Sequence, residues 1–280
     1  MTTRNNEDRI GPQTIDSEPT AALNPLEFVA PTELVDIPSK GLLYPADHPV
    51  HGKEEIEIRY MTAKEEDILT SKTLLKKGVA IDRFLQNIIV DKKINVNDLL
   101  IGDKNAILIA ARATGYGSDY ETQVVCPNCG TKSRESFDLA NPHVNESKVN
   151  EELGIRKTEN NNFLLTMPFS KFEVEIRVLT GNDEKQITKL ADSRKKGMMQ
   201  ETGMTDQYKM MIVSVQENTQ RNVINHYVDN MPLRDARFLR NAYKVVNPDV
   251  KVQKHFECSN CGFDQEMEVP FGADFLWPDR

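Results

Sequence analysis

The sequence lacks the features that mark a membrane protein, an exported protein or a common enzyme class. It has no run of about 18 apolar residues, so no membrane-spanning helix is expected. The N-terminus, Met1-Thr2-Thr3-Arg4, has no apolar core of a signal peptide, so export is not expected. There is no phosphate-binding loop, no G-x-G-x-x-G fingerprint and no nucleophile elbow.

Histidine is also scarce, and no catalytic grouping stands out. The five His are scattered along the chain. His255 lies three residues before Cys258 and could replace a metal ligand, but the alternating pattern of its segment favours a position on a strand surface. The carboxylates fall in alternating strands or in first helical turns, where they face solvent or the helix dipole. We therefore expect no enzymatic activity and no small-molecule substrate.

The overall composition is that of a soluble globular protein with an acidic balance. The chain has 280 residues, 39% of them hydrophobic, and a formal net charge of −8. This length allows one large domain or two modest ones. An acidic balance argues against broad contact with a phosphate backbone, so no nucleic-acid partner is expected.

The four cysteines form two similar knuckles, Cys126-Pro127-Asn128-Cys129-Gly130 and Cys258-Ser259-Asn260-Cys261-Gly262. Each has the C-x-x-C spacing that wraps one metal ion, and the following Gly allows the backbone to turn sharply. Together they supply the four sulfurs of a closed tetrahedral site. The sequence thus predicts one structural Zn²⁺ per chain, bound by Cys126, Cys129, Cys258 and Cys261.

The same four cysteines could also bind iron, form disulfides or act in redox chemistry. Ferrous iron fits the same cage. Disulfides within C-x-x-C pairs are strained, and nothing marks the chain as secreted. A redox motif would explain one pair but not two similar ones. The separation of the knuckles far exceeds that of a usual zinc ribbon, so a shared metal would join distant parts of the chain. Four sulfurs leave no open position, which argues against a catalytic metal and a metal-dependent hydrolase.

The chain divides into four parts. Residues 1–32 are polar, carry several prolines and are interpreted as a disordered or extended arm. Residues 33–145 are predicted to form a first α+β unit, 146–162 a linker, and 163–280 a second α+β unit with an aromatic tail. In the first unit we expect, in order, a strand at 55–61, helices from 63, at 81–90 and after a cap at Asp103, and strands at 120–125 and 131–139. In the second we expect a hairpin over 163–179 and helices at 181–194, 205–215 and 233–246.

The two units resemble each other in sequence. Residues 55–62 (EIEIRYMT) align with residues 173–180 (EVEIRVLT), and both continue into an acidic first helical turn. Asp103 and Asp235 stand at the same distance before their knuckles. We therefore predict an internal repeat: an α+β fold of two related hairpin-plus-helices units, joined by a shared four-cysteine, zinc-ribbon-like site.

Three motifs together carry a family resemblance: Ile37-Pro38-Ser39-Lys40-Gly41-Leu42-Leu43-Tyr44-Pro45, the Cys-Pro-Asn-Cys-Gly knuckle, and Phe275-Leu276-Trp277-Pro278. From about residue 34 to its end, the chain resembles the baseplate hub proteins of T4-type contractile-tailed bacteriophages. The resemblance implies a late structural or assembly protein of the central tail hub, present in the host cytoplasm during assembly or retained in the virion. Its partners would be other hub or tail proteins.

The apolar tail is a candidate anchor for such a partner, formed by Phe271, Phe275, Leu276 and Trp277. The alternative is that these residues cap this protein's own core. A different class of function, a zinc-ribbon regulator that binds nucleic acid, would normally place Lys, Arg and aromatic residues beside the knuckles. The flanks here are mixed and hold acidic residues such as Glu121, Glu135 and Glu257, which favours the structural interpretation.

Overall fold

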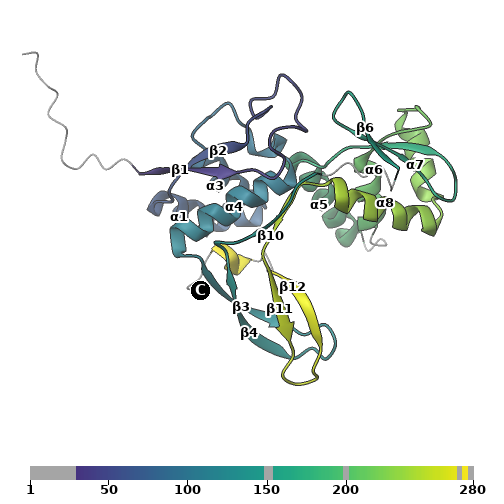
Figure 1. Ribbon diagram of the computed structural model, residues 1–280. Helices are drawn as coiled ribbons and strands as arrows, with labels where there is room; N and C mark the ends of the chain where they lie inside the picture. The colour runs from purple at the N-terminus through teal and green to yellow at the C-terminus, as the bar shows by residue number, and fades with distance from the viewer. Residues whose placement is uncertain (1–29, 148–153, 198–201, 270–272, 277–280) are drawn as a thin grey trace, which may run out of the picture. The chain divides into compact units, whose positions relative to one another are not determined.

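The computed structural model describes residues 30–147, 154–197, 202–269 and 273–276. Helices and antiparallel strands alternate along these residues, so the fold is α+β as predicted (Figure 1). The predictions made for the arm before residue 30 concern residues outside the described ones. From Pro31 onward the chain forms a single contiguous unit, and the division into two related units is an interpretation within it.

The N-terminal part consists of one strand pair and a helical layer. β1 and β2 pair antiparallel, with Val35 opposite Ile56. Along β2 the alternation predicted from sequence holds, because Ile56 and Ile58 are buried while Glu55 and Glu57 are exposed. The elements are β1 (Thr32–Asp36), β2 (Glu55–Arg59), α1 (Ala63–Thr70), α2 (Lys72–Lys76), α3 (Ala80–Ile88) and α4 (Ile101–Tyr116).

The second part contains the four-stranded sheet β6-β7-β8-β9 and four helices. Phe163, Leu165, Val174 and Ile176 of its two central strands are fully buried. The elements are β6 (Ile155–Lys157), β7 (Phe163–Thr166), β8 (Glu173–Ile176), α5 (Gly181–Lys196), α6 (Gly203–Met211), β9 (Ile212–Val215), α7 (Arg221–Asp229) and α8 (Leu233–Val246).

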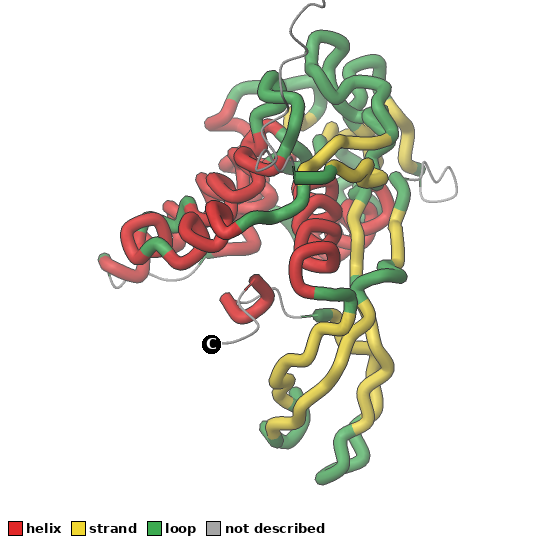
Figure 2. Tube along the Cα trace, turned by 90° about the vertical axis from the view of Figure 1, so that its left-hand side faces the viewer, coloured by secondary structure: helices red, strands yellow, loops and turns green. Residues whose placement is uncertain are grey.

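Each part ends in a hairpin that carries one cysteine knuckle. β3 (Asp119–Val125) pairs with β4 (Lys132–Asp138), and β11 (Gln253–Glu257) pairs with β12 (Asp264–Glu268). Figures 1 and 2 show the two hairpins extending side by side, away from the helices. At their base, β5 (His143–Asn145) of the first part pairs with β10 (Asp249–Lys251) of the second. The chain therefore crosses between its two parts by backbone pairing as well as at the knuckles.

Helix α4 lies at the junction of the two parts. Its Gly102 packs so closely on the segment before β10 that a Cβ there would lie 2.0 Å from the Pro248 carbonyl oxygen. On the next turn, Lys104 forms ion pairs with Asp82 of α3 and Glu184 of α5, each at 2.9 Å. A glycine is thus required at position 102 by the close backbone approach rather than by its φ angle.

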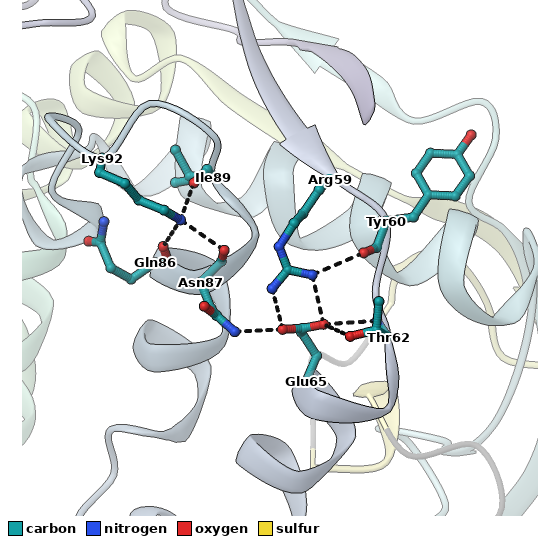
Figure 3. Close-up of polar contacts among 8 residues, drawn as sticks. All are labelled: Arg59, Tyr60, Thr62, Glu65, Gln86, Asn87, Ile89 and Lys92. Atoms are coloured by element: carbon teal, nitrogen blue, oxygen red, sulfur yellow. Dashed lines mark hydrogen bonds and ion pairs between the residues drawn. The ribbon is translucent and has the colours of Figure 1, made fainter. Parts of the chain in front are cut away.

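A buried carboxylate organises the start of α1 (Figure 3), and the same arrangement recurs at α5. Arg59 donates two hydrogen bonds to Glu65, which also accepts from the backbone N–H and hydroxyl of Thr62. At α5, Arg177 and Thr180 make the same contacts to Asp183. Both are capping boxes with an added bidentate arginine.

A second buried carboxylate also occurs twice. Asp103 accepts from the Ser39 backbone N–H and hydroxyl and from the Tyr44 hydroxyl. Asp235 accepts from the backbone N–H groups of Phe169 and Ser170. Both residues are fully buried, and burial raises the pKa of Asp103. Asp103 was predicted to cap a helix; α4 instead begins at Ile101, so Asp103 lies in its first turn and holds the loop after β1.

Three further predictions differ from the structure. The segment 205–215 was predicted as one helix, but α6 ends at Met211 and Ile212–Val215 pairs with β8 as β9, because its apolar run fills the sheet. Helix α7 was not predicted. Within the predicted linker 146–162, Ile155–Lys157 forms the edge strand β6; residues 148–153 lie outside the described ones.

The Glu65 cluster predicts a dependence of stability on acid. Burial disfavours the Glu65 carboxylate, but hydrogen bonds from Arg59 and Thr62 outweigh this and lower its pKa to about 2. Since an unfolded Glu titrates near 4.3, the carboxylate stabilises the fold above that pH and loses this effect as pH falls toward 2. We expect Glu65→Gln to lower the free energy of unfolding by about 3 kcal/mol at pH 7, with the loss shrinking between pH 4.3 and pH 2.

Denaturant unfolding at a series of pH values measures this difference. The control is Glu66→Gln, at the exposed neighbouring position, which should change stability by less than about 0.5 kcal/mol. A Glu65→Gln deficit that stays constant from pH 7 to pH 2 would contradict the assigned pKa.

Candidate metal centre

The two knuckles have the same backbone geometry. In the first, the Cys126 N–H donates to the Thr131 carbonyl at 2.8 Å and the Gly130 N–H donates to the Cys126 carbonyl at 2.9 Å. In the second, the Cys258 N–H donates to Phe263 at 2.8 Å and the Gly262 N–H donates to Cys258 at 2.9 Å. Gly130 and Gly262 have φ angles of 73° and 64°, in the left-handed region that glycine adopts without strain.

This turn directs all four sulfurs to one point between the hairpins. The Sγ atoms lie within 4.8 Å of one another. Cys126 approaches Cys261 to 3.7 Å, and Cys129 approaches Cys258 to 3.6 Å. With Zn–S bonds of about 2.3 Å, sulfurs at the corners of a tetrahedron stand about 3.8 Å apart. The donor set therefore fits a zinc ion, or a ferrous ion of similar size.

The same distances exclude disulfide bonds in this arrangement. A disulfide requires sulfurs about 2.05 Å apart, and all four cysteines are free. The close pairs also run between knuckles rather than within them. The cysteines of each close pair are 135 and 129 residues apart in the chain, so a bound metal would cross-link the two hairpins.

Two asparagines reach across the site, and the sequence analysis did not single them out. Asn128 Nδ2 donates to the Cys261 sulfur, and Asn260 Nδ2 donates to the Cys129 sulfur, each at 3.6 Å. The available signal was that both knuckles read Cys-x-Asn-Cys-Gly. Each asparagine thus supports a ligand of the opposite knuckle, a role that partners beyond the ligands commonly play in metal sites.

Hydrogen bonding favours the thiolate form of the exposed Cys129. The Thr131 side chain and backbone, followed by Asn260, lower the pKa of Cys129 to about 5. The thiolate is the form that ligates metal. Cys126 and Cys258 are buried, whereas Cys129 and Cys261 are exposed, so the site lies at the surface with one half embedded between the hairpins.

An ion pair near the site joins the two hairpins. Lys254 of β11 bonds to Glu135 of β4 at 2.7 Å. His255, considered above as a substitute ligand, is 62% exposed and lies 3.0 Å from Asp264. It is not among the residues that the structure gathers into a metal-binding group, which agrees with a position on a strand surface.

The tail residues that the structure describes are buried in the protein's own core. Phe275 and Leu276, in the short 3-10 helix Ala273–Leu276, are 1% and 2% exposed. The Phe275 ring packs edge-on against Tyr120 at 5.1 Å, and its carbonyl accepts from Arg112 of α4. Neither side chain is available as an exposed anchor, and both fit the cap interpretation. Phe271 and Trp277 lie outside the described residues.

A known protein family matches most of this chain. The sequence model of the family described as T4 bacteriophage base plate protein matches residues 43–277. The chain belongs to this family. Comparison with curated proteins and with solved structures gave no significant match. Membership confirms the T4-type resemblance and indicates that this baseplate protein has a structural role in a phage tail, in contact with other tail proteins. Within the residues that the structure describes, none of the helices of this baseplate protein is long and apolar enough to span a membrane.

The sulfur cluster predicts one metal per chain. Native mass spectrometry of the purified baseplate protein, compared with the denatured mass, should show a gain of one zinc ion. A visible absorption band that appears on oxidation to the ferric form would identify iron instead, since Zn²⁺ has a filled d shell and no such band. A native mass without metal, two hydrogens lighter per cysteine pair, would mean disulfides and would contradict the site.

Loss of one ligand is expected to impair folding or solubility. Cys129→Ser replaces a thiolate with a hydroxyl that binds zinc poorly, and the metal's binding energy contributes to folding. The Tm of Cys129→Ser should fall, and the metal should be lost in dialysis. Ser259→Ala, which changes the same kind of loop without removing a ligand, is the control; a Cys129→Ser protein with wild-type melting would contradict this account.

The bridging asparagines give a finer test. Removal of an outer partner of a metal ligand typically costs about 10- to 100-fold in affinity. We expect Asn128→Ala and Asn260→Ala to weaken zinc binding by about 10-fold each in chelator competition. Asn141→Ala, at an exposed position beyond the end of β4, should leave the affinity unchanged. Equal affinities in all four proteins would show that the N–H···S contacts are inconsequential.

Proposed function

We propose that this baseplate protein is a component or assembly factor of the central hub of a contractile tail, acting through protein–protein contacts and held together by a structural zinc. The family match carries the baseplate part of the proposal. The hub assignment comes from the opening, knuckle and closing motifs of the sequence. The zinc assignment is supported by the four converging sulfurs.

A metal at this position would have a definite mechanical role. The hairpins have few buried side chains of their own, such as Val124 and Phe137 in one and Phe256 in the other. Four thiolates bound to one ion would fix their distal ends, while the β5–β10 pair and the tail hold their base. The ion would thus act as a staple that keeps two segments of a scaffold in fixed relation.

The repeated carboxylate clusters support the proposal of an internal duplication. Glu65 and Asp183 make matching contacts. Asp103 and Asp235 also match, because each holds the loop between a pair of adjacent strands, β1–β2 for Asp103 and β7–β8 for Asp235. The knuckles add a third matching pair. Two copies of one unit that share a metal would give an assembly part with two similar ends.

Charge at the hairpins favours protein contacts over nucleic-acid binding. Lys254 and Lys251 are both paired with carboxylates, Glu135 and Glu268. Glu257 is exposed beside the second knuckle. Cations that already pair with carboxylates add less to binding of a phosphate backbone, which favours the structural interpretation over the regulator alternative.

The hub role is tested by loss of the protein during infection. When expression is blocked, infected cells should accumulate heads and lack complete baseplates, and complementation should restore them. Mass spectrometry of baseplate intermediates and of mature virions separates a retained hub component from an assembly factor. The purified chain should pass a phosphate-rich column without salt-sensitive retention. Normal baseplates without the protein, or salt-sensitive binding to DNA, would overturn the proposal.

A further inference from the structure

The contact between the two parts of the chain includes a short backbone interlock. On one side is the α4 shelf, Leu99–Ile101; on the other is the α5 corner, Leu179–Gly181. The Ile101 N–H donates to the Leu179 carbonyl at 3.2 Å, and the Gly181 N–H donates to the Leu99 carbonyl at 2.9 Å. Leu100 and Thr180 form an isolated antiparallel bridge between them.

This interlock is apolar and flanked by an ion pair. Leu99, Leu100 and Leu179 are at most 5% exposed. Next to them, Lys104 of α4 pairs with Glu184 of α5 at 2.9 Å. The shelf therefore offers an apolar strip and a cation, and the corner offers an apolar residue and a carboxylate in the first turn of the helix.

The second part carries a shelf of the same kind that is open. Leu99 stands four residues before Asp103, and Ile101 stands two residues before it. Met231 and Leu233 stand at the same two distances before Asp235. We name Met231–Leu233 the α8 shelf. Leu233 is 75% exposed, and Phe169 and Phe172, in the turn that Asp235 holds, are 59% and 40% exposed. Three large apolar side chains thus lie on the surface where the equivalent strip of the first part is covered.

The first part carries the matching corner. Thr62 precedes Glu65 as Thr180 precedes Asp183, and both pairs form the same capping box. Met61–Ala63 is therefore the α1 corner, equivalent to Leu179–Gly181. Thr62 and Met61 are half-buried, and Ala63 is exposed. Each chain thus presents one open shelf and one open corner, on different parts.

We propose that the α1 corner of one copy of this chain docks on the α8 shelf of a second copy, repeating between chains the interlock that α5 and α4 make within one. The bonds that the interlock needs are available at both sites. Pro232 lacks an N–H, but the equivalent N–H of Leu100 bonds to Tyr44 and not to the corner. The N–H at Leu233 is in the first turn of α8, where helices leave such groups without a partner in the helix.

Charge is complementary across the proposed contact. Arg234 and Arg237 are exposed in the first turns of α8, and Glu66 and Asp67 are exposed in the first half of α1. Glu66 stands where Glu184 stands in the interlock within the chain, whereas the position of Lys104, the partner of Glu184, is occupied by Ala236. The cations beside the α8 shelf would therefore be Arg234 and Arg237. Opposite charges at the rim would favour this register and orientation.

The contact joins two different surfaces, so association does not stop at a dimer. Each added copy leaves a free shelf at one end and a free corner at the other, which gives a closed ring or an open filament. This inference goes beyond the hub role and does not depend on the identity of the metal. It is distinguished from the proposed function because the purified, metal-loaded full chain is sufficient to test it.

Sedimentation velocity over about 1–100 μM, the range in which interfaces with micromolar Kd values associate, tests the proposal. The wild-type protein should show an average mass that rises above 31.8 kDa with concentration. Leu233→Glu should remain monomeric, or need at least a 10-fold higher concentration to associate. Leu34→Glu is the matched control, because Leu34 is 64% exposed on β1 and belongs to neither the α8 shelf nor the α1 corner.

A charge exchange identifies the pairing of copies. Glu66→Arg and Arg237→Glu should each weaken association when studied alone, and an equimolar mixture of the two should restore it. A wild-type protein that is monomeric throughout the range would overturn the proposal, as would a Leu34→Glu protein that loses association as Leu233→Glu does. Binding of the shelf to a different tail protein, with no self-association, would overturn it as well.

Discussion

The arrangement of this protein depends on one geometric constraint: two pairs of sulfur atoms, more than 120 residues apart in the chain, converge within 4.8 Å. The constraint can be met only if both hairpins end in the same turn and extend side by side. The left-handed glycines after the second cysteine of each knuckle provide that turn. The β5–β10 pair and the packing of Gly102 against Pro248 bring the bases of the hairpins together.

Buried carboxylates perform the local organisation that a chain of modest hydrophobicity needs. Glu65 and Asp183 each join a strand end, a helix start and an arginine; Asp103 and Asp235 each anchor a loop to a helix. Every one of these acids accepts at least two hydrogen bonds, and these compensate in part for the cost of burying a carboxyl group. Because the same capping and loop-holding contacts occur in both parts, two different sequences reach similar local structures.

The two parts are not related to each other symmetrically throughout. At the knuckles the contacts are reciprocal, because Asn128 reaches Cys261 and Asn260 reaches Cys129. At the interlock they are one-sided, because the α4 shelf is covered and the α8 shelf is not. Because the contact at the interlock is one-sided, the α8 shelf and the α1 corner are not covered by each other within the chain. Surfaces of this kind suit an assembly part and are consistent with membership of a baseplate family.

The sequence by itself determined the two cysteine knuckles, the acidic first turns of the helices and the long periodic elements, because these depend on residues close together in the chain. The C-x-x-C spacing, the alternation over Glu55–Arg59 and the face of Leu233–Val246 needed no tertiary information. Tertiary structure alone decided the rest. Ile212–Val215 became a strand because β8 offered an edge, and Asp103 left its expected capping role because Ser39 and Tyr44 supplied donors from another segment. Phe275 and Leu276 were buried because Tyr120 and α4 form a recess for them. Contacts between distant segments carry no periodic signal, so no pattern along the chain could have placed these residues.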